Sequence, residues 1–186
     1  SGAALMATPY AALTPEVLLG AVESCGLRCD GRLQGLNSYE NRVYQVWLED
    51  GTAVVAKFYR PQRWSAAAIQ EEHDFALELA AREIPVVAPL QLVGRTRHEH
   101  QGFQFAVYPR RGGRSPELED PETLRWMGRF IARIHAVGGT RPFEHRPRLD
   151  IAGFGYEPAQ FVIDSDYVPE DMRDAYSSVV ADVLER

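Results

Sequence analysis

The sequence has 186 residues, of which 45% are hydrophobic and 25% are charged, so one large domain or two small lobes with a sizeable core can form. Its 20 basic and 26 acidic side chains leave a net charge of −6, which argues against nucleic acid or an anionic membrane as the main partner. No apolar run is long enough to span a bilayer and no secretory signal is recognisable, so we expect neither a membrane protein nor a secreted one. The two cysteines, Cys25 and Cys29, predict neither a disulfide framework nor a zinc site, which is typical of cytoplasmic proteins.

The first third of the chain predicts a leading helix and a β-hairpin. A helix is expected over residues 14–25, with a threonine cap, a proline at its first position and a glycine stop. Two apolar stretches, 43–48 and 53–59, are joined by a turn that contains Asp50-Gly51, and this pattern predicts a hairpin. The second strand is apolar on both faces, so we expect it in the centre of its sheet.

The next segment predicts a helix followed by two more strands. Ser65 is a suitable N-cap for a helix that reaches about Arg82, where an Ile-Pro step ends the pattern. The stretches "VVAPLQLVG" over 86–94 and "GFQFAVYP" over 102–109 predict strands joined by a polar turn that contains histidines. The first half of the chain is therefore expected to be a small antiparallel sheet with one inserted helix.

The composition changes after Pro109, where a polar, glycine-containing connector begins. Beyond it we expect a helix capped by Asp120 and ended near Gly138, irregular structure over 141–168, and a third helix from Pro169. The expected fold class is α+β in three parts: an N-terminal lobe with its leading helix at 1–108, a hinge and connector at 109–119, and the start of a helical lobe at 120–186.

One lysine, Lys57, lies in the predicted central strand among valine, alanine and phenylalanine residues. A lysine is rarely buried there unless a negative charge meets it. On a helical wheel of about 100° per residue for the following helix, Glu72 falls in the middle of the apolar stripe, whereas Glu71 falls among polar neighbours. We therefore predict that Glu72, and not Glu71, pairs with Lys57. A purely structural buried salt bridge is the alternative interpretation.

The stretch "GLNSYENRVY" precedes the hairpin and could surround a phosphate with backbone N–H groups and short polar side chains, such as Ser38 and Asn41. An ordinary polar loop is the alternative, because the stretch has no G-x-G-x-x-G pattern. The order of loop, hairpin, lysine, helix and inward-facing glutamate is nevertheless that of a kinase small lobe. In such a lobe the lysine holds phosphates and the glutamate orients the lysine.

Several stretches resemble a known family, namely "LNSYENRVYQV", "VVAKFYRPQRW", "EEHDFALEL", "IPVVAPL", "GFQFAVYPRRGGR" and "GRFIARIH". The chain resembles the aminoglycoside phosphotransferase and choline kinase-like group of the protein-kinase-like fold, and within it the bacterial stress response kinase A family. The resemblance covers the chain from about Leu13 to the C-terminus. It implies an ATP-dependent serine/threonine protein kinase that uses Mg²⁺, phosphorylates a protein substrate and acts in stress responses in the cytoplasm.

The resemblance also implies roles for individual residues. Lys57 would contact the α- and β-phosphates of ATP, Glu72 would orient it, and the stretch from Ser38 to Asn41 would replace the glycine-rich loop. "AVYPRR" would be the hinge, and apolar groups beside the lysine, Val55 and Ala56, could cover the purine. The ATP-binding residues expected in this chain are Ser38, Tyr39, Glu40, Asn41, Val55, Lys57, Glu72, Tyr108 through its carbonyl and Arg110 through its N–H.

Two further features are open to a structural and a functional interpretation. His135 lies near the middle of the apolar stripe of the second long helix, so we expect it in the core and not at a reaction centre. The basic cluster Arg110, Arg111 and Arg114 beside the hinge is either a solvated loop or a contact for nucleotide or an acidic peptide.

A kinase of this group also needs a catalytic loop of the form H-G-D-x-x-x-x-N and a later aspartate for Mg²⁺. "HRPRLDIAGFG" over 145–155 is a poor match, because Asp150 stands five residues after His145 and Pro147 interrupts. We therefore expect the catalytic aspartate and the metal ligands beyond Arg186, an incomplete helical lobe, and no phosphate transfer by this chain alone. The alternatives are a small-molecule kinase of the aminoglycoside, choline or homoserine type, and a non-catalytic nucleotide-binding module.

Overall fold

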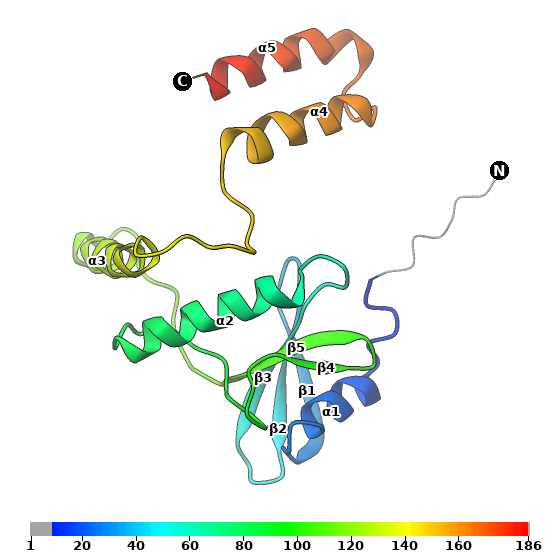
Figure 1. Cartoon of the computed structure of the whole chain (residues 1–186), viewed down its shortest axis with the longest axis vertical. Helices are drawn as coiled ribbons and strands as arrows, with labels where there is room; N and C mark the ends of the chain where they lie inside the picture. Colours follow the sequence, from blue (N-terminus) through cyan, green and yellow to red (C-terminus); the bar gives the residue numbers. More distant parts are fainter. Residues whose placement is uncertain (1–8, 186) are drawn as a thin grey trace, which may run out of the picture. The chain divides into compact units, whose positions relative to one another are not determined.

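The computed structural model describes residues 9–185, and this part of the chain divides into two compact units at the step from His145 to Arg146. The first unit contains an antiparallel sheet with helices, and the second is helical (Figure 1). The first eight residues of the predicted lobe 1–108, and Arg186, lie outside the described residues. Within the described range no helix is long and apolar enough to cross a membrane.

The sheet of the first unit has the strand order β1-β2-β3-β5-β4, so β3 is its central strand. The β2–β3 turn places Gly51 at φ +82°, a left-handed conformation that favours glycine. The predicted hairpin and its central second strand are therefore confirmed. The strands span Cys29–Leu36 (β1), Arg42–Leu48 (β2), Ala53–Phe58 (β3), His98–His100 (β4) and Phe103–Pro109 (β5).

Two predictions for the sheet are wrong. β1 is missing from the predicted elements because its sequence, "CDGRLQGL", lacks an apolar alternation; the strand forms by pairing with β2 across a register shift. The strand expected over 86–94 is replaced by irregular chain that contains Pro89, which cannot donate to a ladder, and by an isolated bridge from Leu92 to Arg95. β4 lies instead in the segment predicted as a polar turn.

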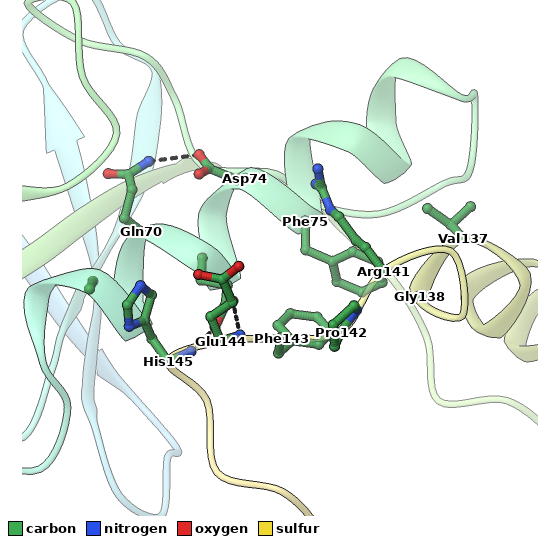
Figure 2. Close-up of a pocket in the computed structure, with 12 residues that line it drawn as sticks. Gln70, Asp74, Phe75, Val137, Gly138, Arg141, Pro142, Phe143, Glu144 and His145 are labelled. Carbon is green, nitrogen blue, oxygen red and sulfur yellow. Dashed lines mark hydrogen bonds between the residues drawn. The ribbon is translucent and has the colours of Figure 1, made fainter.

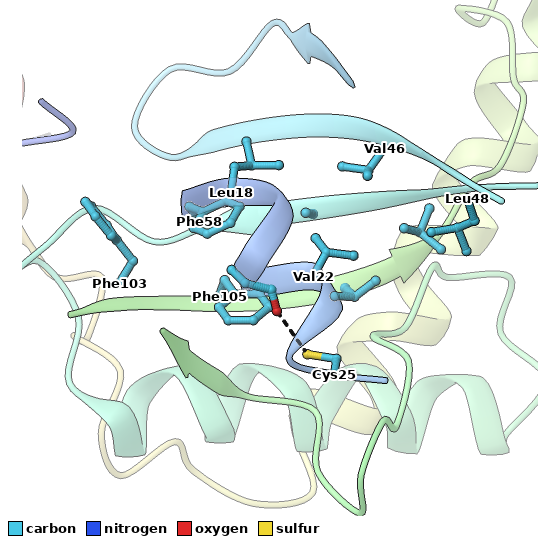
Figure 3. Close-up of a cluster of buried hydrophobic side chains, with 12 residues drawn as sticks. Leu18, Val22, Cys25, Val46, Leu48, Phe58, Phe103 and Phe105 are labelled. Atoms are coloured by element: carbon cyan, nitrogen blue, oxygen red, sulfur yellow. Dashed lines mark hydrogen bonds between the residues drawn. The ribbon is translucent and has the colours of Figure 1, made fainter. Parts of the chain in front are cut away.

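Helix α1 (Pro15–Glu23) packs on one face of the sheet and forms the main core with it (Figure 3). Leu18 and Val22 of this helix are buried against Val46, Phe58 and Phe105. The last two rings stack with their centroids 5.2 Å apart. The apolar residues of this leading helix therefore support the sheet on the face opposite to Lys57. The two cysteines are free thiols, one of them buried in this core.

Helix α2 (Ala66–Ala81) begins at Ser65, whose hydroxyl accepts the N–H of Ala68 at 3.1 Å, as the predicted N-cap requires. Successive side chains of a strand point to opposite faces, so Ala56 is buried in the α1 core whereas Lys57 points to the side of α2. Ala56 therefore cannot cover a ligand beside Lys57, contrary to the prediction. Ile69 anchors α2 to the sheet in a second, smaller cluster.

Helix α3 (Pro121–Gly138) starts at the predicted N-cap, Asp120, and packs on α2 near its C-terminal end, where Val137 meets Leu79. The N-terminal part of its apolar stripe is exposed in the described structure, with Leu124 at 49%. The prediction that His135 lies in the core is wrong, because its side chain is exposed on this helix.

The second unit contains two helices and two short helical turns. The helix predicted after Pro169 is confirmed, but the irregular structure predicted over 141–168 is wrong for residues 152–164. The π-helical turn there packs closely on the last helix, since a Cβ at Gly155 would lie 2.7 Å from Leu184 Cδ2. The elements are Ala152–Tyr156 (η1), Glu157–Asp164 (α4), Glu170–Met172 (η2) and Arg173–Leu184 (α5).

Candidate nucleotide-binding site

Lys57 and Glu72 form an ion pair between β3 and α2, with Nζ 2.7 Å from Oε1. Their side chains are 21% and 30% exposed, so water screens this pair less than a fully exposed one. The ammonium also lies 4.6 Å from the centre of the Tyr59 ring, which favours a cation. The prediction that Glu72 rather than Glu71 meets Lys57 is confirmed.

A cavity of about 440 Å³ surrounds this ion pair, within the usual size range of small-molecule sites. Five small apolar side chains line it, and Lys57 and Arg111 contribute two cationic groups against the single carboxylate of Glu72. Such a cavity can hold a ligand with a flat apolar part and an anionic part. The lining residues are Val43, Val55, Lys57, Glu72, His73, Ala76, Val87, Tyr108, Pro109 and Arg111.

A buried polar network lies behind the cavity. His73, which is fully buried, has Nε2 2.7 Å from the Tyr59 hydroxyl and Nδ1 2.9 Å from the Thr96 hydroxyl. Tyr59 in turn lies 3.5 Å from the hydroxyl of Tyr108. Burial lowers the pKa of His73 to about 4, with a smaller effect of Lys57, and burial raises the pKa of Tyr108 to about 12. Both side chains are therefore neutral at physiological pH.

The loop expected to surround phosphates lies outside the cavity lining and is held by contacts of its own. The Ser38 hydroxyl donates to the Asn41 carbonyl, and the Tyr39 side chain is fully exposed. Glu40 accepts a hydrogen bond from Trp64 Nε1 at 2.7 Å and pairs with Arg63. The structure therefore fixes the shape of this loop without directing its side chains toward Lys57.

The expected hinge follows β5, where Tyr108 pairs with Val55 of β3 and both line the cavity. Pro109 and Arg111 also line it, whereas the side chain of Arg110 turns away and donates from Nε to Gln45 Oε1 at 3.3 Å. Of the nine expected site residues, the structure brings four together, namely Val55, Lys57, Glu72 and Tyr108.

Some lining residues were missed by the sequence predictions. His73 lies outside the apolar stripe of the α2 wheel, so only its position beside Glu72 could have indicated it. Arg111 belongs to the basic cluster already noted, but the sequence could not show which of its arginines faces the cavity. Among residues 9–185, no group of three or more histidine, cysteine, aspartate or glutamate side chains is placed to hold a metal ion.

Comparison with known proteins shows the family of this chain. Residues 32–183 match the family model described as the phosphotransferase enzyme family. The chain belongs to the phosphotransferase enzyme family. It is 43% identical over 167 residues to "Stress response kinase A" of Salmonella choleraesuis, which covers 90% of this chain and 51% of the relative. The protein of the same name from Escherichia coli K12 is 39% identical over 175 residues, or 94% of this chain and 53% of the relative.

A third relative carries a more specific name. "Serine/threonine protein kinase RdoA" of Salmonella typhimurium is 42% identical over 167 residues, again 90% of this chain and 51% of that protein. The phosphotransferase-family chain described here thus spans about half the length of the curated relatives it matches.

A solved structure shares the fold. The structure described as amicoumacin kinase hAmiN in complex with AMP-PNP, Ca²⁺ and Ami aligns with a TM-score of 0.66 over 89% of this chain and 53% of that chain. The two sequences are 18% identical, so the likeness concerns the fold alone. It confirms the predicted kinase-like α+β fold of this family member.

On the other side of α2, the phosphotransferase-family fold has a second cavity of about 380 Å³ (Figure 2). Glu71 faces it and accepts the backbone N–H groups of Glu144 at 2.5 Å and His145 at 3.0 Å. Phe75 and Phe143 meet edge to face nearby, with centroids 5.2 Å apart. Glu71 therefore lies among polar neighbours, as predicted, and its carboxylate holds the segment that follows α3.

The stretch "HRPRLDIAGFG" has a structural explanation in this fold. Asp150 accepts the N–H of Gly153 at 2.8 Å, which is the contact of a residue that caps a helical turn. Its carboxylate therefore stabilises the start of the turn that leads into α4.

Proposed function

We propose that the cavity around Lys57 and Glu72 binds ATP, and that the whole protein is an ATP-dependent serine/threonine protein kinase of a stress response. The observation that carries the proposal is the 2.7 Å ion pair inside a cavity with apolar walls. A lysine held by a glutamate of the following helix is the phosphate-binding arrangement of protein kinases. The names of the relatives, stress response kinase A and serine/threonine protein kinase, support the acceptor class.

In this proposal the ammonium of Lys57 contacts the α- and β-phosphates, and Glu72 keeps it in place. Arg111, the second cation of the cavity, adds attraction for the triphosphate. The purine lies against Val55, and the chain beside Pro109 offers the Tyr108 carbonyl and the Arg110 N–H to adenine. Because these hinge contacts use the backbone, the outward side chain of Arg110 does not oppose them.

The loop from Ser38 to Asn41 would take part through its backbone N–H groups. Its side chains hold the loop itself, as the contacts of Glu40 with Trp64 and Arg63 indicate. In kinases Mg²⁺ neutralises the charge of the phosphates. We place its ligands and the catalytic aspartate beyond Arg186, and we therefore expect the full protein, and not this chain alone, to transfer phosphate.

Nucleotide binding can be tested on this chain with AMP-PNP and calorimetry. Removing the ammonium in Lys57→Ala should weaken binding by about tenfold or more, because charge-assisted hydrogen bonds to phosphate are among the strongest polar contacts. Glu72→Gln should weaken it by about tenfold at most, because the lysine remains but loses the carboxylate that orients it. Glu71→Gln is the matched control, one residue away on the other side of α2, and should bind as the unaltered chain does. Equal affinities of the unaltered chain and Lys57→Ala would remove Lys57 from the phosphate site.

A second measurement uses the fact that Lys57 is the only lysine of the sequence. An amine-reactive acylating reagent can therefore modify only this side chain and the chain's α-amino group. AMP-PNP should protect Lys57 and leave the α-amino group reactive, as read by mass spectrometry. Equal reactivity of Lys57 with and without nucleotide would contradict the proposal.

The acceptor is tested on the full-length protein with radiolabelled ATP. We expect label on serine or threonine of protein acceptors, and none on an aminoglycoside or on amicoumacin. Label on the antibiotic alone would replace the protein-kinase assignment with that of a small-molecule kinase.

A further inference from the structure

The buried network behind the cavity joins three separate parts of the fold at one histidine of α2. His73 Nε2 reaches the hydroxyl of Tyr59, which directly follows β3, at 2.7 Å, and Nδ1 reaches Thr96, in the segment before β4, at 2.9 Å. The ring also lies edge-on to Tyr108 of β5, with centroids 6.5 Å apart. His73 is 0% exposed, Thr96 4% and Tyr59 2%, so water cannot replace these partners without opening the core.

One order of donors gives the hydroxyls of Thr96 and Tyr59 one donor and one acceptor role each. Gln70 donates from its amide to Thr96 Oγ1 at 3.4 Å, and the Thr96 hydroxyl donates to Nδ1 of His73. The single proton of the neutral ring then lies on Nε2 and is donated to Tyr59, which donates in turn to Tyr108 at 3.5 Å. The chain of donors thus runs from the outer side of α2 to the hinge strand.

We propose that His73, as the Nε2–H tautomer, is a positioning residue that fixes the rotation of α2 and thereby holds Glu72 against Lys57. Glu72 precedes His73 on the helix, so any rotation that moves the carboxylate away from Lys57 also pulls the ring from both hydroxyls. Such a rotation leaves buried donors and acceptors without partners, which is unfavourable. This inference rests on the proposed function, because the property that it regulates is the phosphate-binding geometry of Lys57.

The test separates positioning from simple structural support by comparing two ligands. AMP-PNP uses the phosphate site, whereas adenosine uses only the hinge and the apolar walls. His73→Phe keeps a ring of similar volume and removes both nitrogens, and it should weaken AMP-PNP binding by about tenfold while adenosine affinity changes less than about twofold. Equal losses for both ligands, or no loss for AMP-PNP, would overturn the proposal.

His98→Phe is the matched control. His98 is a second buried histidine, on the face of the sheet that carries the α1 core, and its Nε2 has no hydrogen-bond partner in the described structure. Its replacement therefore removes ring nitrogens from a buried site without touching the network. AMP-PNP and adenosine should bind to this variant as they bind to the unaltered chain, and a tenfold loss for AMP-PNP alone in this variant would also count against the proposal.

Two amide variants test which ring nitrogen of His73 carries the proton, and they remain decisive if His73→Phe does not fold. The amide of His73→Gln can reach the position of Nε2 and donate to Tyr59, whereas the shorter His73→Asn reaches only the position of Nδ1. Glutamine should therefore retain most of the AMP-PNP affinity and asparagine should not. The reverse order would overturn the assigned tautomer, and equal affinities at the unaltered level would overturn the positioning role.

Failure of the proposed function looks different from failure of this inference. If the unaltered chain and Lys57→Ala bind AMP-PNP equally, the nucleotide site itself is wrong, and the positioning role falls with it. If Lys57→Ala weakens binding and His73→Phe does not, the nucleotide site stands and only the role of His73 is excluded.

Discussion

Glu71 and Glu72 are neighbours with the same side chain, yet they face two different cavities and hold different parts of the fold. Glu72 meets a charged side chain, Lys57, in a cavity with apolar walls. Glu71 meets two backbone N–H groups of the segment after α3. One side of α2 therefore places a carboxylate beside a cation, and the other side holds the chain. The different roles of the two glutamates therefore depend on their contact partners and not on the side chain itself.

The largest expected effect is on the pH dependence of the free energy of unfolding, and it comes from His73, on the Lys57 side of α2. Its folded pKa, about 4, lies below the unfolded value of 6.5, so the unfolded chain binds the proton first as pH falls. The contribution of the neutral ring is complete above about pH 6.5 and is lost between there and pH 4, on the order of 3 kcal/mol. Urea unfolding between pH 4 and 7 should show this slope in the unaltered chain and a flatter one in His73→Phe. Parallel curves would show that His73 titrates normally.

The contribution of the Lys57–Glu72 ion pair to stability can be measured separately from its contribution to nucleotide binding. Lys57→Met leaves the half-buried carboxylate of Glu72 without its main partner and should lower the free energy of unfolding by about 2 kcal/mol. Lys57→Met combined with Glu72→Gln should recover about half of that loss, because no charge is left behind. Both variants should bind AMP-PNP at least about tenfold more weakly than the unaltered chain, because both lack the ammonium. Recovery of nucleotide binding in the double variant would place the phosphate contact elsewhere.

On the opposite side, Glu71→Leu should cost about 1 kcal/mol of stability, because two backbone N–H groups lose their acceptor. Amide hydrogen exchange of Glu144 and His145 should become faster, whereas the AMP-PNP affinity should change less than about twofold. A large loss of nucleotide affinity would mean that the two sides of α2 are coupled, and that the contrast between them is weaker than the structure suggests.

The smallest effect is expected for Arg141→Ala. Arg141 pairs with Glu78 at 2.8 Å, but its side chain is 66% exposed and Glu78 also pairs with Arg82. Such surface pairs contribute roughly 0–1 kcal/mol, so thermal unfolding should barely change. A shift as large as that of Glu71→Leu would show that the second cavity depends on this arginine.

The sequence predicted those features that depend on local pattern. The hairpin, the central strand, the Ser65 and Asp120 caps and the pairing of Glu72 with Lys57 all follow from periodicities of two or 3.6 residues and from capping chemistry. These signals lie within one element or between two that follow each other, so one chain is sufficient to detect them.

The features that were missed depend on partners distant in sequence. β1 is a strand because its backbone pairs with β2. The hydrogen-bond partners of Glu71 lie more than seventy residues later in the sequence. The network of His73 needs Thr96, which lies 23 residues later in the loop before β4. Periodicity contains no information on such partners, and the exposure of His135 likewise depends on what packs against α3 and not on its own pattern.

The central position of Lys57 also makes the chain a reporter of its own unfolding. A protease that cuts only after lysine has one internal site in these 186 residues, and that site lies in β3, with neighbours on both sides of the strand. Loop motions and frayed ends cannot expose it, so cleavage requires the sheet to open. The rate of a single cut, read on a gel, then measures how often the middle of the sheet separates.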